Sequence, residues 1–175
     1  MNQKYIITGG PGTGKTSIIK ELIKRGFVCH HEKTREIISE QINNGGDILP
    51  WKNQIAFENK IANIRTQQYL ATKENSICFF DRSPLDCIAY LKLNNLKATS
   101  KILKNIQKCD FNKTVFYTPI WEEIYINDNE RKENIEQAKK IEKAILHIYK
   151  SRNYELIEIP KCSIIERTNF IISTI

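Results

Sequence analysis

Hydrophobic and polar residues follow two different periods along this chain. Five short apolar runs, rich in β-branched and aromatic residues, predict strands at residues 4–8, 27–29, 76–81, 113–117 and 154–159. Between them apolar residues recur at helical spacing, which predicts helices at 16–25, 34–42, 52–73, 85–93, 100–108, from after Arg131 to about 152, and after Pro160. The sequence therefore predicts a regular alternation of strands and helices.

This alternation indicates an α/β fold. Each connection between predicted strands is long enough to contain a helix, and such crossovers join parallel strands. We therefore expect three layers, with a five-stranded parallel sheet in the middle and helices on both faces. A length of 175 residues fits one domain, spanning 1–175, better than two.

The first predicted strand leads directly into a glycine-rich turn. The phosphate-loop pattern G-x-x-x-x-G-K-[ST] is matched without a mismatch by residues 9–16, GGPGTGKT. In this pattern backbone N–H groups form a concave anion site, which side chains at Gly9, Gly12 or Gly14 would obstruct. Lys15 can reach the β- and γ-phosphate oxygens, the hydroxyl of Thr16 can bind Mg²⁺, and the next helix adds its N-terminal dipole.

The context of this turn favours a nucleotide site over a chance glycine turn before a Lys-Thr pair. Strand, glycine loop and helix is the order that the motif requires. We expect a nucleotide triphosphate to bind on Gly9, Gly10, Pro11, Gly12, Thr13, Gly14, Lys15, Thr16 and Ser17.

The third predicted strand ends in a carboxylate. Residues 76–80 form an apolar run, typical of a strand buried on both faces, and Asp81 follows it. Because ligands bind at the carboxyl edge of parallel strands, Asp81 is placed to hold Mg²⁺ opposite Thr16. Apolar strands followed by Asp are common, so it is the phosphate loop upstream that makes this interpretation the favoured one.

Charge and cysteine usage narrow the class of protein. The net charge of +7 suits anionic phosphate substrates, and a nucleic-acid surface is less favoured because the lysines are spread along the chain. Lys101, Lys104 and Lys108, for example, fall on the outer side of one predicted helix. The five cysteines never form a C-x-x-C pair, which argues against a structural zinc site and a disulfide framework.

No run approaches the roughly 18 apolar residues of a membrane span. The chain enters its first strand without a secretory leader. We therefore expect a cytoplasmic protein with no membrane partner.

A phosphate loop does not by itself choose between a kinase, an ATPase and a GTPase. A guanine-reading Asn-Lys-x-Asp box is not found, since Asn112-Lys113 precedes a strand and continues as Thr-Val. The chain also leaves little room for the helical lid domain of hexameric motor ATPases. A small-molecule kinase is favoured, which needs an orienting carboxylate or base, cations on the phosphoryl group and a lid that excludes water.

Three residues are candidates for these tasks. Glu32, just after the second predicted strand, could accept the proton of the acceptor hydroxyl, or could form a surface ion pair with a neighbouring Lys or Arg. Arg82 could bind acceptor or phosphate oxygens in a bidentate way, or form a structural salt bridge. Arg131 lies in a segment where we expect a short lid, around 118–132, and could fold over the phosphates; an exposed arginine at a helix start is the alternative.

Two aromatic residues accompany the long predicted helix 52–73. Trp51 and Phe57 could stack on a flat substrate base. Core packing is the commoner role of aromatic residues on such a helix, so both interpretations stay open.

The order of these motifs resembles a known family. The matching stretches are residues 6–16, His31-Glu32-x-x-Arg35-Glu36, Asp81-Arg82 with Asp86 after it, Pro119-x-Trp121 and Asp128-x-x-Arg131. Together they look like the small AAA-type domain family that includes the ribosylnicotinamide-kinase part of NadR, over nearly the whole chain. The resemblance implies a P-loop kinase-like fold and ATP-dependent phosphorylation of a nucleoside-like hydroxyl. Asp81-Arg82-Ser83 also resembles the Asp-Arg box of thymidylate kinases and the Glu-Arg-Ser box of deoxynucleoside kinases, which is consistent with Arg82 near an acceptor.

We therefore expect a kinase that binds ATP and Mg²⁺ and phosphorylates a nucleoside-like small molecule, as a monomer or homodimer. Two alternatives stay open: a nucleoside monophosphate kinase, and a nucleotide-dependent ATPase or GTPase switch that a partner protein reads. Because the first strand begins near residue 4, we expect no preceding nucleotidyltransferase domain and no bifunctional NadR reaction.

Overall fold

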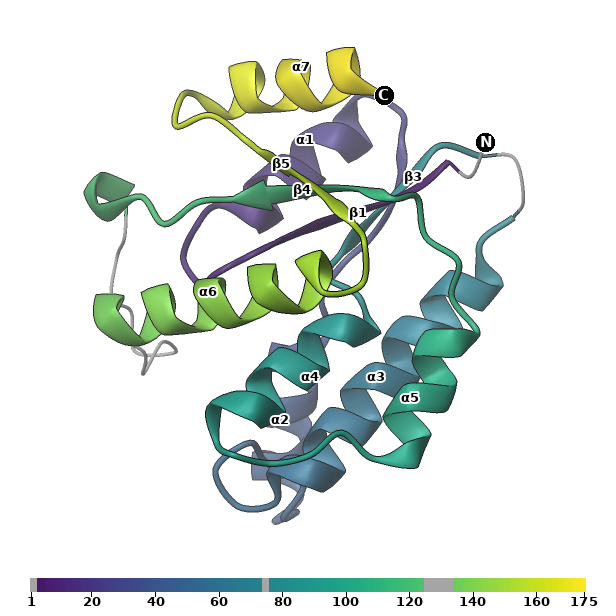
Figure 1. Ribbon diagram of the computed structural model, residues 1–175, viewed down its shortest axis with the longest axis vertical. Coiled ribbons are helices and arrows are strands. Elements are labelled where there is room, and N and C mark those ends of the chain that lie inside the picture. Colours follow the sequence, from purple (N-terminus) through teal and green to yellow (C-terminus); the bar gives the residue numbers. More distant parts are fainter. Residues whose placement is uncertain (1–2, 74–75, 125–133) are drawn as a thin grey trace.

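The computed structural model describes residues 3–73, 76–124 and 134–175. A central sheet lies between two layers of helices (Figure 1). The elements in chain order are β1 (Lys4–Gly9), α1 (Lys15–Lys24), β2 (Val28–His30), α2 (Thr34–Asn43), α3 (Gln54–Ala71), β3 (Cys78–Asp81), α4 (Pro84–Leu93), α5 (Ser100–Gln107), β4 (Thr114–Thr118), the 3-10 helix η1 (Glu122–Ile124), α6 (Ile135–Lys150), β5 (Glu155–Glu158) and α7 (Ile164–Thr174).

Each predicted strand and helix is present, with ends that differ by a few residues. The strand order is β2-β3-β1-β4-β5, and all four neighbouring pairs are parallel. The prediction of a three-layer α/β fold with a five-stranded parallel sheet is therefore confirmed. The extent of one domain over 1–175 stays a prediction.

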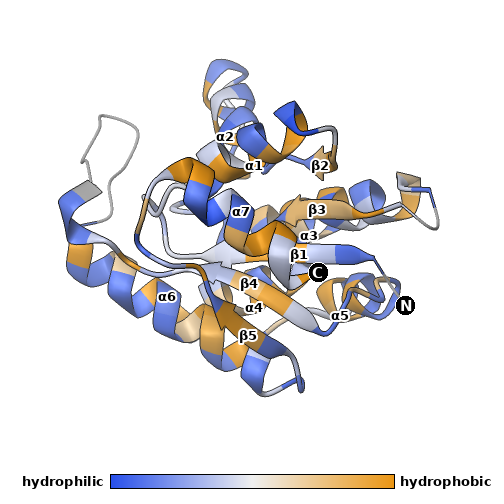
Figure 2. Ribbon diagram, turned by 90° about the horizontal axis from the view of Figure 1, so that it is seen from above, coloured by the Kyte–Doolittle hydropathy of each residue, from blue (hydrophilic) through white to orange (hydrophobic). Residues whose placement is uncertain are grey.

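The central strands are buried on both faces, which explains their continuous apolar sequence. Ile7 and Phe79 pack under α1 and α7, whereas Ile6 and Phe80 face the opposite layer, which contains α3 to α6 (Figure 1). In Figure 2 hydrophobic and hydrophilic colours alternate along α6. Such alternation is expected of a helix with one buried side.

The burial of α3 departs from a simple apolar stripe. Ile55 and Leu70 are 41% and 53% exposed. Glu58 and Arg65 are buried instead. The reason is that one side of α3 packs on α4 and α5 while polar side chains on its inner side border a cleft described below. Ile23 on α1 is likewise exposed.

Three further observations concern the lysines, the cysteines and the helices of the described residues. Lys101, Lys104 and Lys108 are exposed on and just after α5. All five cysteines are free thiols, with Cys78 and Cys87 fully buried. Among the helices of the described ranges, none has the length and apolar character needed to cross a bilayer.

Gly9 ends β1 in a conformation that favours glycine. Its φ is +135°, and a Cβ atom there would lie 2.5 Å from both the carbonyl oxygen and Oγ1 of Thr118. The close approach of β4 therefore requires a glycine at this position. Gly12 and Gly14 also have positive φ, 77° and 85°, which side chains disfavour.

Gly9→Ala should destabilise the fold far more than Gly26→Ala does. Gly26 also has a positive φ, +88°, but a Cβ atom added there would meet nothing within 4 Å. The control should therefore lose only the strain of about 1–2 kcal/mol, whereas Gly9→Ala adds a backbone clash and should lose more than about 3 kcal/mol. Urea unfolding measures both, and equal losses would contradict the role of Thr118.

Candidate functional site

The predicted site residues come from distant stretches but meet at one edge of the sheet. The register pairs Ile7 of β1 with Asp81 of β3, and Gly9 with Thr118 of β4. Glu32 follows shortly after the end of β2. The carboxyl ends of parallel strands form the edge where ligands bind in open α/β sheets.

Buried hydroxyl groups connect the phosphate loop to the neighbouring strands. Thr13 Oγ1 donates to the Gly10 carbonyl at 3.0 Å and lies 2.5 Å from Thr118 Oγ1, which donates in turn to the Thr8 carbonyl. α1 begins at Lys15, and Thr16 and Ser17 are exposed on its first turn. The loop is thus tied to β1 and β4 while the start of α1 stays accessible.

Lys15 is buried beneath this loop. Its Nζ donates to the carbonyl oxygens of Gly10 at 2.6 Å and of Gly9 at 3.3 Å, and no ion pair joins it to a carboxylate among the described residues. Burial lowers the pKa of Lys15 to about 8, with a further contribution from the positive charge of Arg82. Its charge is therefore not neutralised by a direct partner, which suits an anion site.

Asp81 is also buried, and one of its carboxylate oxygens has no hydrogen-bond donor among the described residues. It is 4% exposed, and its Oδ1 accepts no hydrogen bond within the described ranges. Burial, followed by repulsion from Glu32, raises the pKa of Asp81 to about 6. A buried carboxylate oxygen without a donor is what a hard cation would complete.

The oxygen atoms at this edge of the sheet fit Mg²⁺ better than a metal that is ligated by protein side chains alone. In the part of the chain that the structure describes, no three His, Cys, Asp or Glu side chains gather as a metal site. Mg²⁺ takes one or two protein oxygens and fills the rest of its octahedron with water and phosphate oxygens. Asp81 and Thr16 would be its protein ligands.

Glu32 is engaged by two arginines rather than by its sequence neighbours. Its Oε1 lies 2.9 Å from the NH2 nitrogen of Arg65 and 3.1 Å from Nε of Arg82, and accepts a hydrogen bond from Thr34 Oγ1. Burial would raise the pKa of Glu32, but the charges of Arg82 and Arg65 outweigh it and lower the pKa to about 2. Lys33, one of the sequence neighbours considered as a partner, pairs with Glu36.

A second carboxylate fixes the other side of Arg82. Asp86, fully buried, accepts hydrogen bonds from Arg82 NH1 at 3.1 Å, Thr8 Oγ1 at 2.6 Å and the hydroxyl of Tyr149 at 2.5 Å. Its other role is the capping box of α4, in which Ser83 N donates to Oδ2. Arg82 itself has φ +72°, a strained value that such a network can maintain. Arg82 thus lies in the site and is ion-paired there.

A large cleft opens beside this cluster. Its volume is about 960 Å³, and it is lined by α2, the loop before α3, α3, the end of α4 and the start of α6. Glu32 and Arg65 belong to both the cluster and the cleft wall. Phe57 lines the cleft from the core and Trp51 lies exposed at its rim, so both predicted aromatic residues border it. Whether they stack on a substrate stays a prediction.

Arg167 of α7 is a site neighbour that the sequence did not reveal. It is 1% exposed, and its NH2 nitrogen donates to the Thr13 carbonyl at 3.0 Å. Its Nε and NH1 have no hydrogen-bond partner in the described chain. The sequence analysis did not name Arg65 either. Its position four residues after Ile61, on the same side of the predicted helix, was a usable signal.

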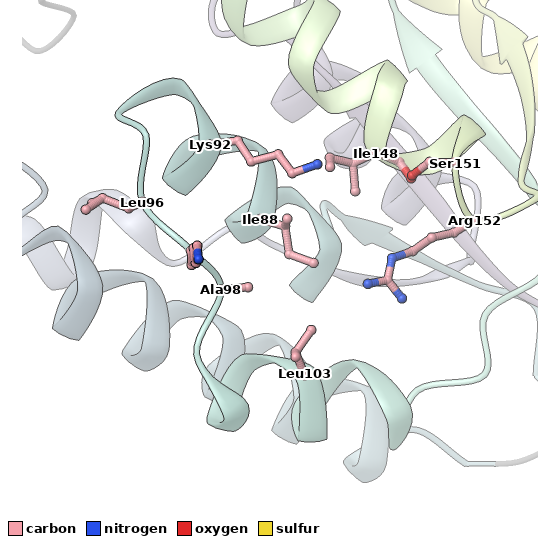
Figure 3. Close-up of a pocket in the computed structure, with 9 residues that line it drawn as sticks. Ile88, Lys92, Leu96, Ala98, Leu103, Ile148, Ser151 and Arg152 are labelled. Carbon is pink, nitrogen blue, oxygen red and sulfur yellow. The ribbon is translucent and has the colours of Figure 1, made fainter.

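A smaller hollow of about 330 Å³ lies away from this site, at the ends of α4 and α6. Figure 3 shows Ile88, Leu103 and Arg152 converging on it. None of the predicted site residues lines it, and its cations are exposed on its rim. Arg131 and most of the predicted lid, 118–132, lie outside the described residues.

The fold is shared with known kinases. Deoxyadenosine kinase from M. mycoides superimposes with a TM-score of 0.69 at 20% identity, covering 98% of this chain and 97% of that one. Thymidylate kinase from Candida albicans gives 0.66 at 15%, covering 99% and 90%. NadR in complex with NR gives 0.68 at 15%, covering 91% of this chain and 46% of that chain. Among proteins of curated function, none matches this sequence.

The phosphate loop on this parallel sheet defines a P-loop NTPase fold of the nucleoside- and nucleotide-kinase type. A family model described as an AAA domain matches residues 4–167. The chain belongs to that AAA domain family, and the resemblance inferred from the motifs is confirmed.

Asp81→Asn should stabilise the protein at alkaline pH. Because the pKa of Asp81 is raised from 3.8 to about 6, the folded protein retains a proton between these values that the unfolded chain has released. Stability contributed by this group therefore falls as pH rises through that window. At about pH 8 the variant should gain on the order of 2 kcal/mol.

Urea unfolding at about pH 5 and pH 8 measures this effect, with Asp47→Asn on an exposed loop as the control. A variant that gains nothing at the higher pH would show that Asp81 is not destabilised by burial.

Arg167→Met should weaken nucleotide binding without unfolding the protein. Methionine keeps much of the side-chain volume and removes a buried charge, which is often neutral for stability. Losing the bond to Thr13 should raise the nucleotide dissociation constant by about tenfold. Arg25→Met is the matched control, since Arg25 also contacts α7 through Asn169 but is exposed and lies at the end of α1 away from the loop. Titration with a fluorescent nucleotide measures the dissociation constants. A wild-type affinity in Arg167→Met would contradict the role of Arg167.

Proposed function

We propose that this protein is a kinase that transfers the γ-phosphoryl group of ATP to a hydroxyl of a nucleoside-like small molecule. The observation that carries this proposal is the position of Glu32 and Arg65. They belong at once to the charged cluster beside the phosphate loop and to the wall of the 960 Å³ cleft. A nucleotide switch has no need of such a cleft, whereas a kinase must hold a second substrate there.

Residues Gly9 to Ser17 would bind the polyphosphate through backbone N–H groups and the start of α1. Lys15 would donate to phosphate oxygens, exchanging its present carbonyl partners for charged ones. When bound between Asp81 and Thr16, Mg²⁺ would supply charge neutralisation on the transferring group. Arg131, from the predicted lid, would add a cation over the phosphates.

Glu32 would orient the acceptor hydroxyl rather than act as a strong base. With a pKa near 2 it stays ionised at neutral pH and is a weak proton acceptor, far from the value that general-base catalysis favours. Phosphoryl transfer passes through a loose transition state, for which positioning matters more than early proton removal. Arg82 and Arg65 hold the Glu32 carboxylate in place.

The names of the similar structures support a nucleoside-like acceptor. They include a deoxyadenosine kinase, a thymidylate kinase and NadR bound to NR. A second candidate is a nucleoside monophosphate kinase, which the cations Arg35 and Lys140 in the cleft wall would favour, because they could hold an acceptor phosphate.

The test is ADP formation from Mg-ATP with and without nucleosides, nicotinamide riboside and nucleoside monophosphates. A kinase should form ADP faster with one class of acceptor, and a phosphorylated product should appear in equal amount. Lys15→Ala should abolish both nucleotide binding and turnover, because the phosphates lose their buried cation. Slow hydrolysis that is indifferent to every acceptor would favour the switch and refute the kinase.

A further inference from the structure

One carboxyl group in the cleft has no part in the mechanism above. Glu58, on α3, lines the cleft and is 4% exposed. Burying a carboxyl group is costly unless a partner compensates it. Glu58 forms no ion pair within the described residues, and the thiol of Cys87 is its hydrogen-bond partner. The carboxyl group is therefore buried without a cation paired to it in the described ranges, and a thiol is a weak donor.

The nearby cations are already occupied by other carboxylates. Arg65 donates to Glu32 and to the Ser83 carbonyl, and Arg82 is shared between Glu32 and Asp86. Burial raises the pKa of Glu58 to about 7, and the charge of Arg65 offsets only part of this shift. A ligand that donates hydrogen bonds to Glu58 would stabilise its carboxylate, which the nearby cations do not pair with.

Aromatic side chains surround the same space. Phe57 precedes Glu58 on α3, and Tyr90 of α4 and Trp51 line the same cleft. The guanidinium carbon of Arg82 lies 5.7 Å from the centre of the Tyr90 ring. Aromatic walls bind flat rings, and a volume of about 960 Å³ is large enough for a ligand the size of a nucleoside.

We propose that Glu58 accepts a hydrogen bond from an exocyclic amino group on the flat ring of the acceptor. The acceptor is then an aminated nucleoside, such as adenosine or cytidine, in preference to its keto counterpart. An ionised carboxylate only accepts hydrogen bonds, so a ring carbonyl placed against it is repelled and leaves the group unpaired. This inference rests on the proposed function in taking the cleft as the acceptor site.

The experiment compares equilibrium binding of matched pairs, adenosine with inosine and cytidine with uridine, by titration calorimetry at about pH 8. A non-hydrolysable ATP analogue and Mg²⁺ are present throughout. The wild type should bind the amino member of a pair at least about tenfold more tightly, as expected for hydrogen bonds to a charged group. Glu58→Met should reduce that ratio to near one, and Glu58→Gln, whose carbonyl still accepts, should keep part of it.

Glu40→Met is the matched control, since Glu40 lies exposed on α2 outside the cleft. Urea unfolding verifies that each variant is folded. A Glu58→Met protein that keeps the wild-type ratio, or a wild type that binds neither member of either pair, overturns the proposal. Because binding needs no phosphoryl transfer, a failed kinase assay refutes the proposed reaction alone and leaves this result to be judged separately.

Discussion

The site depends on a balance of buried charge at the carboxyl edge of the sheet. Three buried cations, Lys15, Arg65 and Arg82, meet two buried carboxylates, Asp81 and Asp86, and the partly exposed Glu32. Burial of any one alone would be prohibitive, and only the mutual attraction of the set makes the cluster tolerable. Lys15 and Asp81 are the two members without an ion pair among the described residues, and they are the ones that a metal-bound nucleotide would engage.

The fold was predictable because its signals are local and repeated. The alternation of apolar strands with helical periods gave the element order, and long crossovers implied parallel pairing. The polar inner side of α3 could not be read from the sequence, for a physical reason. Hydrophobic periodicity assumes that a buried side is apolar, and α3 buries Glu58 and Arg65 beside a cleft instead.

The candidate site was only partly predictable for the same reason. Glycines, Lys15 and Asp81 follow patterns within a few residues, so the chain itself shows them. Arg167 meets Thr13, and Tyr149 meets Asp86, only after folding has brought α7 and α6 beside the phosphate loop and α4. No local pattern encodes contacts across such separations. The roles of Glu32, Arg82 and Arg131 stay predictions until kinetic measurements are made.

The position of β1 in the sheet has a consequence for biosynthesis. β1 is made first, yet its two partners are β3 and β4, which leave the ribosome much later. Until they arrive, an apolar strand has nothing to pair with and is exposed to aggregation. The loop after β1 therefore acquires its final geometry only when Thr118 of β4 has been synthesised.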